Sequence, residues 1–344
     1  MKVAIVCPYD LGRFGGVQDQ ALSLAAWLRD VGHEAFVVGP GDGPAGTVSV
    51  GRSVPVPANG SVAPVSLRPR QLKRLVAATE GVDVVHIHEP LMPTVSLAAT
   101  RLPDVPKVGT FHADPSRTLR RLYRSAGAVA RRIVARLDVV TAVSPVAASV
   151  VDGLAPVRLV PNGIDVAAYH PSPGSFGRVA FLGRDDPRKG LDVLLAAWPQ
   201  VLAAIPDAEL VVAAGERREE LAGVRFATVP EGEKRAYLQD ASIYCAPNLG
   251  GESFGIVLVE GMAAGCAVVA SALPAFAHVL GDAGVLTKPG DADGLAGALI
   301  RVLGDAALCR ELQDRALQRV ARFDRRAVLD GYLAAYQAAM APHS

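Results

Sequence analysis

Residues 242–270 of the chain read SIYCAPNLGGESFGIVLVEGMAAGCAVVA. An apolar stretch is followed by a turn at Pro247-Asn248, by a segment that can be helical from about Phe254, and by a second apolar stretch. That order predicts a strand–helix–strand unit of a parallel α/β sheet. Glycines and bare amides fall at the N-terminus of the predicted helix, where unpaired N–H groups and the helix dipole favour an anion.

Two carboxylates flank this helix N-terminus. Glu252 lies just outside it, and Glu260 lies about two turns inside the predicted helix. Amides that can bind phosphate, next to carboxylates that can bind hydroxyls, are suited to a nucleotide sugar. The alternative is a helix that merely packs closely through Gly and Ala, and the two carboxylates at this spacing favour the binding site over it.

The same alternation extends over all 344 residues, enough for two domains with separate cores. Continuous β-branched stretches with helical patterns between them predict parallel strands buried on both faces. The predicted strands are 3–7, 35–38, 84–88, 107–111, 139–143 and 157–160 and, after a linker at 169–175, 178–182, 209–213, 242–246 and 267–270. We therefore expect two doubly wound α/β domains, at 1–170 and 171–325, and a helix at 326–344 that returns to the first.

Composition and charge narrow the class of protein. Apolar residues make up 50% of the chain, charged residues 20%, and the formal net charge is +1, so no global field favours nucleic acid. Four scattered cysteines without a Cys-x-x-Cys motif favour a reduced cytoplasmic compartment over a disulfide framework. The N-terminal apolar run is too short for a signal peptide, and no run reaches the roughly 20 residues of a membrane-spanning helix, so a soluble or peripheral protein is expected.

Two further turns follow predicted strands. Gly15-Gly16 lets the backbone approach a ligand closely at the start of a helix, but the turn lacks the Gly-x-Gly-x-x-Gly pattern of an NAD site. A tight turn without function is the alternative. In the loop 184–190, Arg184 and Lys189 are placed to bind a diphosphate at the carboxyl end of a strand, unless the opposite charges of this loop simply pair with one another.

Three histidines stand at or near the ends of two strands of the first domain. His86 and His88 lie on one face of their strand because side chains alternate, and His112 follows the next strand. This spacing is compatible with a metal site, but no clear third ligand is present and polar residues often cap a sheet. His112 is the one best placed to touch a substrate.

Basic residues form two clusters in the first domain. The second has the spacing of one helical face, which could attract anionic lipid headgroups or could be an ordinary solvated surface. The clusters are Arg68, Arg70, Lys73 and Arg74, and Arg117, Arg120, Arg121 and Arg124.

Taken together, these residues resemble the retaining glycosyltransferases of the GT-B class, whose two Rossmann-like domains face each other across a cleft. The resemblance covers nearly the whole chain, and its most specific signature is a pair of glutamates separated by seven residues, here Glu252 and Glu260. Supporting matches are Gly15-Gly16, the run 161–165, Gly183-Arg184 and Lys189-Gly190.

Within this class the chain resembles the actinobacterial phosphatidyl-myo-inositol mannosyltransferases. The matching segments are Val6–Tyr9, Gly15–Gln18, Asn59–Ala63, His86–Pro90, Thr110–His112 and Gly250–Glu260. The resemblance implies catalytic roles for His112, Glu252, Arg184 and Lys189. It implies a donor site of Gly15, Gly16, Arg184, Lys189, Glu252, Phe254, Gly255, Ile256 and Glu260, and acceptor contacts from Tyr9, Gln18, Asn59 and Arg117.

The implied reaction moves mannose from GDP-mannose to phosphatidyl-myo-inositol on the cytoplasmic face of the membrane. Both basic clusters would then contact the anionic membrane surface, and a dependence on Mg²⁺ is compatible with a diphosphate donor. Pro64, Ala113 and Arg117 depart from the family pattern, which has Arg, Thr and Lys there, so the donor half of the assignment is firmer than the lipid half. Open alternatives are a uracil nucleotide or a soluble acceptor, an epimerase or hydrolase, and a binding protein without activity.

Overall fold

The chain folds into two units, each built on its own parallel sheet. In the computed structural model, the first unit comprises Met1–Asn162 and Arg326–Ser344, and the second comprises Gly163–Arg325. The structure describes residues 1–13, 15–52, 55–58, 61–64, 69–113, 127–172, 174–183, 186–214 and 220–342, with 55–58, 61–64, 69 and 70 as backbone only. The expectation of two doubly wound parallel α/β units is confirmed.

The first unit contains a seven-stranded parallel sheet. Its order is β3 (Thr47–Ser49), β2 (Glu34–Gly39), β1 (Lys2–Val6), β6 (Val84–His88), β7 (Lys107–Phe111), β8 (Val139–Ala142) and β9 (Val157–Leu159). A separate hairpin is formed by β4 (Pro55–Ala58) and β5 (Ser61–Pro64). The helices are α1 (Gly16–Asp30), α2 (Pro69–Ala78), α3 (Val95–Ala99), α5 (Gly127–Val134), α6 (Pro145–Ala148) and α13 (Arg325–Met340).

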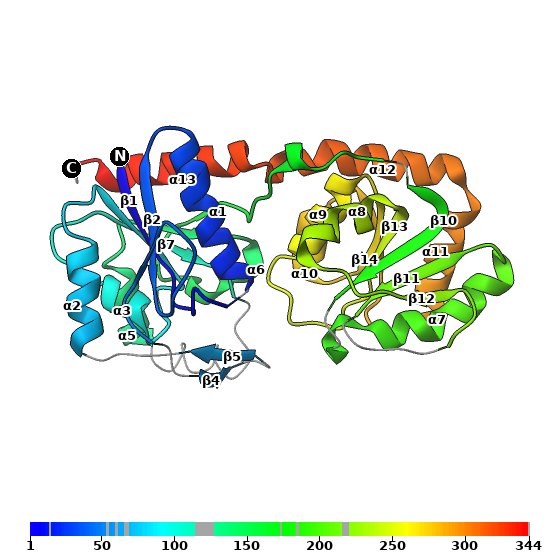
Figure 1. Ribbon diagram of the computed structural model, residues 1–344, viewed down its shortest axis with the longest axis horizontal. Helices are drawn as coiled ribbons and strands as arrows, with labels where there is room; N and C mark the ends of the chain where they lie inside the picture. Colours follow the sequence, from blue (N-terminus) through cyan, green and yellow to red (C-terminus); the bar gives the residue numbers. More distant parts are fainter. Residues whose placement is uncertain are drawn as a thin grey trace. The chain divides into compact units, whose positions relative to one another are not determined.

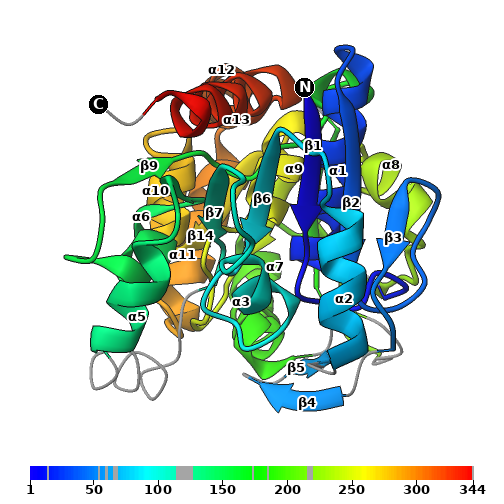
Figure 2. The same ribbon diagram turned by 90° about the vertical axis from the view of Figure 1, so that its left-hand side faces the viewer.

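Helices α1 and α13 cover one face of the first sheet (Figure 1). Val3 and Ile5 of β1 alternate inward and share a buried cluster with Leu24 of α1 and Tyr332 and Tyr336 of α13. On the other face, α3 packs against β1 and β6, with α2 beside it (Figure 2). The last helix of the chain therefore completes the core of the first unit.

The second unit contains a six-stranded parallel sheet. Its order is β12 (Val224–Phe226), β11 (Glu209–Ala213), β10 (Ser175–Leu182), β13 (Ala241–Ala246), β14 (Ala267–Ser271) and β15 (Gly284–Thr287). The helices are α7 (Leu191–Ala204), α8 (Lys234–Gln239), α9 (Ile256–Ala264), α10 (Pro274–Leu280), α11 (Ala292–Gly304) and α12 (Ala306–Val320). Ile243 and Cys245 of β13 pack with α7 and α11, whereas Tyr244 points to the opposite face, against Gly261 of α9.

The division between the units differs from the expected boundary at 170. Ile164 forms a parallel bridge with Asp324, and its amide donates to the Phe323 carbonyl at 2.9 Å. Ser172, expected in a linker, donates to the Ala264 carbonyl at the end of α9. These backbone bonds hold residues 163–175 within the second unit, which composition alone does not indicate.

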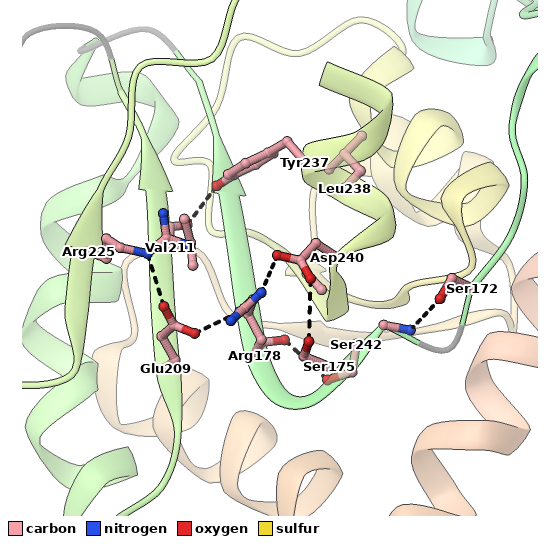
Figure 3. Close-up of polar contacts among 12 residues, drawn as sticks. Ser172, Ser175, Arg178, Glu209, Val211, Arg225, Tyr237, Leu238, Asp240 and Ser242 are labelled. Atoms are coloured by element: carbon pink, nitrogen blue, oxygen red, sulfur yellow. Dashed lines mark hydrogen bonds and ion pairs between the residues drawn. The ribbon is translucent and has the colours of Figure 1, made fainter. Parts of the chain in front are cut away.

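A charged cluster lies at the amino ends of the second sheet (Figure 3). Arg178 pairs with Glu209 at 2.7 Å and with Asp240, and Arg225 donates to the other oxygen of Glu209 at 3.0 Å. Tyr237 donates to the carbonyls of neighbouring strands. Ligands of such sheets bind at the opposite, carboxyl ends, so this cluster ties the strands together and leaves the other edge for function.

Candidate active site

The loops after β10 and β13 meet at the carboxyl edge of the second sheet. These neighbouring strands connect onward in opposite directions, β10 toward β11 and β13 toward β14, which makes this the switch point where ligands bind in doubly wound sheets. The amide of Leu249 donates to the Arg188 carbonyl at 2.8 Å. Gly190 has a φ of 72°, and a Cβ there would collide with Pro247, so a glycine lets the two loops touch.

An ion pair joins these loops. Lys189 Nζ lies 2.7 Å from Glu252 Oε1, and Asn248 Nδ2 donates to the same oxygen at 2.7 Å. Arg188 pairs with Asp186 instead, so opposite charges in the loop do pair with each other in part. Arg184, the other predicted diphosphate ligand, lies outside the described residues.

The N-terminus of α9 opens beside Glu252. The helix begins at Ile256, two residues later than the predicted start at Phe254, which is buried. Gly255 is the N-cap with a φ of 96°, and it has no side chain that could cap the helix. The sequence predicts an anion site at this helix start, and helix N-termini of this kind favour anions.

Glu260 lies in the second turn of α9 and is almost buried. Its Oε1 is 2.7 Å from Nζ of Lys234, the first residue of α8, and the two side chains are 11% and 16% exposed. The sequence analysis places a helix here but does not identify Lys234, because a partner 26 residues away leaves no local pattern. The two carboxylates that the sequence singled out therefore each have a lysine partner.

The carboxyl edge of the first sheet holds two of the four predicted acceptor residues, Tyr9 and Gln18. Gln18 is buried in α1 and donates to the Asp10 carbonyl at 3.3 Å, close to the half-buried Tyr9. A Cβ on Gly16 would meet no described atom within 4 Å, so a ligand has room at this helix start. Asn59 and Arg117 lie outside the described residues.

The three histidines are buried together in the first unit. His86 Nδ1 is 2.8 Å from the Tyr336 hydroxyl and Nε2 is 2.6 Å from Thr110 Oγ1, so both ring nitrogens are engaged within the protein. The rings of His86 and His88 stack at 4.6 Å, and those of His88 and His112 at 4.8 Å. In the part of the chain that the structure describes, no three His, Cys, Asp or Glu side chains gather to hold a metal ion.

Burial keeps these rings neutral. Desolvation lowers the pKa of His86 to about 3 and that of His112 to about 4, and it lowers the pKa of His88 well below its usual value. A side-chain hydrogen bond with Asn162 acts in the opposite direction on His112. Asn162 belongs to the run 161–165 that the sequence analysis noted, although without a role for this side chain.

Glu89 is a further residue of this site that the sequence analysis left unassigned. Its Oε1 accepts from the backbone amides of His112 and Ala113, each at 2.7 Å. Burial raises the pKa of its carboxyl group and the two amides lower it. A glutamate at the end of a strand carries no sequence signal that separates this role from solvent exposure.

Helix α2 carries part of the predicted membrane surface. Lys73 and Arg74 are exposed, as are the apolar Leu72 and Val76, while Leu75 faces the core. No helix in the described ranges is both long and apolar enough to cross a bilayer. The side chains of the other predicted membrane residues, Arg68, Arg70, Arg120, Arg121 and Arg124, lie outside the described residues.

Comparisons with known proteins give the family of the chain. The family described as Glycosyltransferase Family 4 matches residues 14–168, and that described as Glycosyl transferases group 1 matches residues 177–305. The phosphatidyl-myo-inositol mannosyltransferase of Mycolicibacterium smegmatis is 42% identical over 94% of this chain and 90% of its own. That of Propionibacterium freudenreichii is 40% identical over 92% and 90%.

Solved structures share the fold at low identity. A sucrose-phosphate synthase from Thermosynechococcus elongatus superposes with a TM-score of 0.73 at 21% identity, covering 98% of both chains. HepE of Anabaena in complex with UDP gives a TM-score of 0.76 at 19% identity, covering 97% of this chain and 99% of its own.

Proposed function

The chain belongs to the glycosyltransferase family of the phosphatidyl-myo-inositol mannosyltransferases, and on this premise we propose that it transfers mannose from GDP-mannose to phosphatidyl-myo-inositol with retention. The observation that carries the donor half is the Lys189–Glu252 pair beside the uncapped N-terminus of α9. The acceptor half rests on the named relatives and on the residues that match them.

The donor diphosphate binds Lys189, Arg184 and the first amides of α9, and Gly15 and Gly16 also contact the donor. Negative charge develops on the diphosphate as the glycosidic bond breaks, so fixed cations and amides directed at it stabilise the transition state. Glu252 binds hydroxyls of the mannose, and Glu260 binds those of the ribose. Lys189 donates a hydrogen bond to Glu252, so the side chain that binds the diphosphate contacts the one that binds the mannose.

The acceptor inositol lies against Tyr9, Gln18, Asn59 and Arg117, and His112 lies at the transferred sugar. The acceptor hydroxyl attacks on the face from which the diphosphate departs, and the departing phosphate takes the proton of that hydroxyl. Glu89, the described carboxylate bound to the backbone of His112, already accepts two amide hydrogen bonds. A mechanism of this kind needs no covalent glycosyl–carboxylate intermediate.

The basic clusters bring the enzyme to the inner face of the membrane. Lys73 and Arg74 are exposed next to Leu72 and Val76, a combination suited to anionic headgroups and the upper acyl region. The protein is then peripheral and reaches its lipid acceptor from the cytoplasmic side.

A donor and acceptor screen tests this function. Purified protein is incubated with radiolabelled GDP-mannose or UDP-glucose, with phosphatidylinositol vesicles or soluble inositol, and with or without Mg²⁺. We expect labelled mannolipid from GDP-mannose and vesicles alone, with an α-anomeric signal in the product's NMR spectrum. Release of free mannose without acceptor would identify a hydrolase, an isomerised nucleotide sugar an epimerase, and no turnover with any pair a binding protein.

A further inference from the structure

The dipeptide His88-Glu89 at the end of β6 contacts His112 at two points. The His88 ring bonds the His112 ring, with Nδ1 and Nε2 2.7 Å apart. The Glu89 carboxylate bonds the His112 backbone amide, also at 2.7 Å. We infer that His88 and Glu89 are positioning residues that fix the ring and the main chain of His112 for sugar transfer, an inference that rests on the proposed function of His112.

The backbone of Glu89 explains how one strand end reaches both groups. Its amide still pairs with the Thr110 carbonyl at 2.8 Å and continues the ladder between β6 and β7. Its φ of 52° then turns the chain away, and the Glu89 side chain accepts from the two amides that follow β7, those of His112 and Ala113. A left-handed glutamate is unfavourable, and such conformations persist where the surrounding contacts hold them, often at functional sites.

His88 has no comparable structural duty in its ring. The ring is buried. Among the described residues it forms one hydrogen bond, with His112, and its Nε2 has no partner there. An apolar side chain would fill this place without the cost of burying a polar ring. The imidazole is therefore best explained by what it does to His112.

The same orphan nitrogen sets the direction of the hydrogen bond. A buried N–H without an acceptor is rarer and more costly than a bare acceptor, so the His88 proton lies on Nδ1 and is donated to His112 Nε2. The proton of His112 then lies on Nδ1. The side chain of Asn162 contacts this ring, and its Oδ1, which has no partner among the described residues, accepts from that N–H group once the amide is flipped. The contact thus selects one tautomer as well as one orientation.

Substitutions at residue 88 test the ring contact. Asparagine places an N–H near the Nδ1 position, glutamine places one near the Nε2 position, and leucine places none. We expect His88→Asn to keep kcat within about threefold, and His88→Leu and His88→Gln to lower kcat by about 10- to 100-fold at little change in the KM for GDP-mannose. In ¹⁵N spectra of histidine-labelled protein, the His112 ring should keep its tautomer in His88→Asn alone.

Ser96→Ala is the matched control, because Ser96 donates to the His88 carbonyl at 2.6 Å and leaves the ring untouched. It should lower the unfolding temperature without changing kcat or the ring signals. For the contact between Glu89 and the His112 backbone, Glu89→Gln retains an acceptor for the amides and should stay active. Glu89→Ala should lower kcat as much as His88→Leu does. If His88→Leu does not fold, the comparison of kcat between His88→Asn and His88→Gln tests the inference by itself.

Measuring His112→Ala in the same assay separates the positioning roles of His88 and Glu89 from the proposed role of His112 itself. Wild-type kcat in His88→Leu and Glu89→Ala, with His112→Ala inactive, would overturn the positioning roles and keep the proposed function. Full activity of His112→Ala would instead remove the proposed role of His112. An inactive His88→Asn with an active His88→Gln would also overturn the inference.

Discussion

The carboxyl ends of the two sheets differ in the chemistry they present. At the first sheet, three buried histidines and a buried glutamate are held by hydrogen bonds, and desolvation keeps the rings neutral. At the second sheet, Lys189–Glu252 and Lys234–Glu260 form ion pairs that keep some access to solvent. A neutral polyol and an anionic diphosphate would need these two kinds of site.

The difference also separates two ways of preparing a site. The histidine network is desolvated and its hydrogen bonds lie within the protein, which makes it rigid, although His88 Nε2 has no partner among the described residues. The ion pairs hold cations in place before a ligand arrives, and a phosphate can then share them.

Lys189→Ala should have the largest effect. Removal of a charge-assisted contact to the developing diphosphate charge should cost about 2 to 4 kcal/mol, or about 30- to 1,000-fold in kcat/KM. Arg188→Ala is the matched control, since that guanidinium pairs with Asp186. Steady-state kinetics of both variants would contradict the assignment if the two changes were equally harmful or equally mild.

Substitutions of Glu260 and Glu252 should affect different quantities, GDP binding for Glu260 and kcat for Glu252. Glu260→Ala should weaken GDP binding by about 1.5 to 3 kcal/mol, because it removes a ribose contact that ground and transition states share. Glu252→Ala should depress kcat and leave GDP binding nearly intact. Calorimetry with GDP gives the first quantity and steady-state turnover the second, and equal losses of GDP binding would erase the distinction.

Local signals explain how much of this could be predicted. Apolar runs and the glycine-rich turn predict the central strands of both sheets, the start of α9 to within two residues and the two glutamates, because these signals lie within a few neighbouring residues. The short edge strands β3, β12 and β15 were not predicted. Lys234 and Tyr336 were beyond reach, since they meet Glu260 and His86 only through the fold. Glu89 was visible in the sequence, but its left-handed backbone, which aims the carboxylate at His112, was not.

The buried histidines should make the first unit the more acid-sensitive one. With pKa values of His86 and His112 at about 3 and about 4, the unfolded chain binds protons that the folded chain does not as pH falls below 6.5. The free energy of unfolding should therefore decrease with falling pH, by about 1.4 kcal/mol per pH unit for each ring, until the folded pKa is reached.

Each unit has its own tryptophan, Trp27 in the first and Trp198 in the second, so Trp198→Phe and Trp27→Phe variants report the units separately. Denaturant unfolding between pH 7 and 5 should show a steep loss for the first unit. In the second, the lowered pKa values of Asp186 and Glu209 act only at more acidic pH, and the lowered pKa of His278 adds a smaller loss. Equal slopes for the two units would contradict the contrast.

The smallest effect should come from α2, where the charges of the first unit lie on its outside rather than in its site. Replacing Lys73 or Arg74 with Ser should weaken binding to phosphatidylinositol vesicles by about 1 kcal/mol each, an effect that fades with salt. Leu72→Ser with Val76→Ser should weaken binding independently of salt, since these side chains are 47% and 48% exposed and contribute apolar area. Arg315→Ser on α12 serves as the control. GDP binding should be unchanged in every variant, because none of these side chains belongs to the proposed donor site. If none of the four α2 substitutions changes the vesicle affinity, helix α2 has no membrane role.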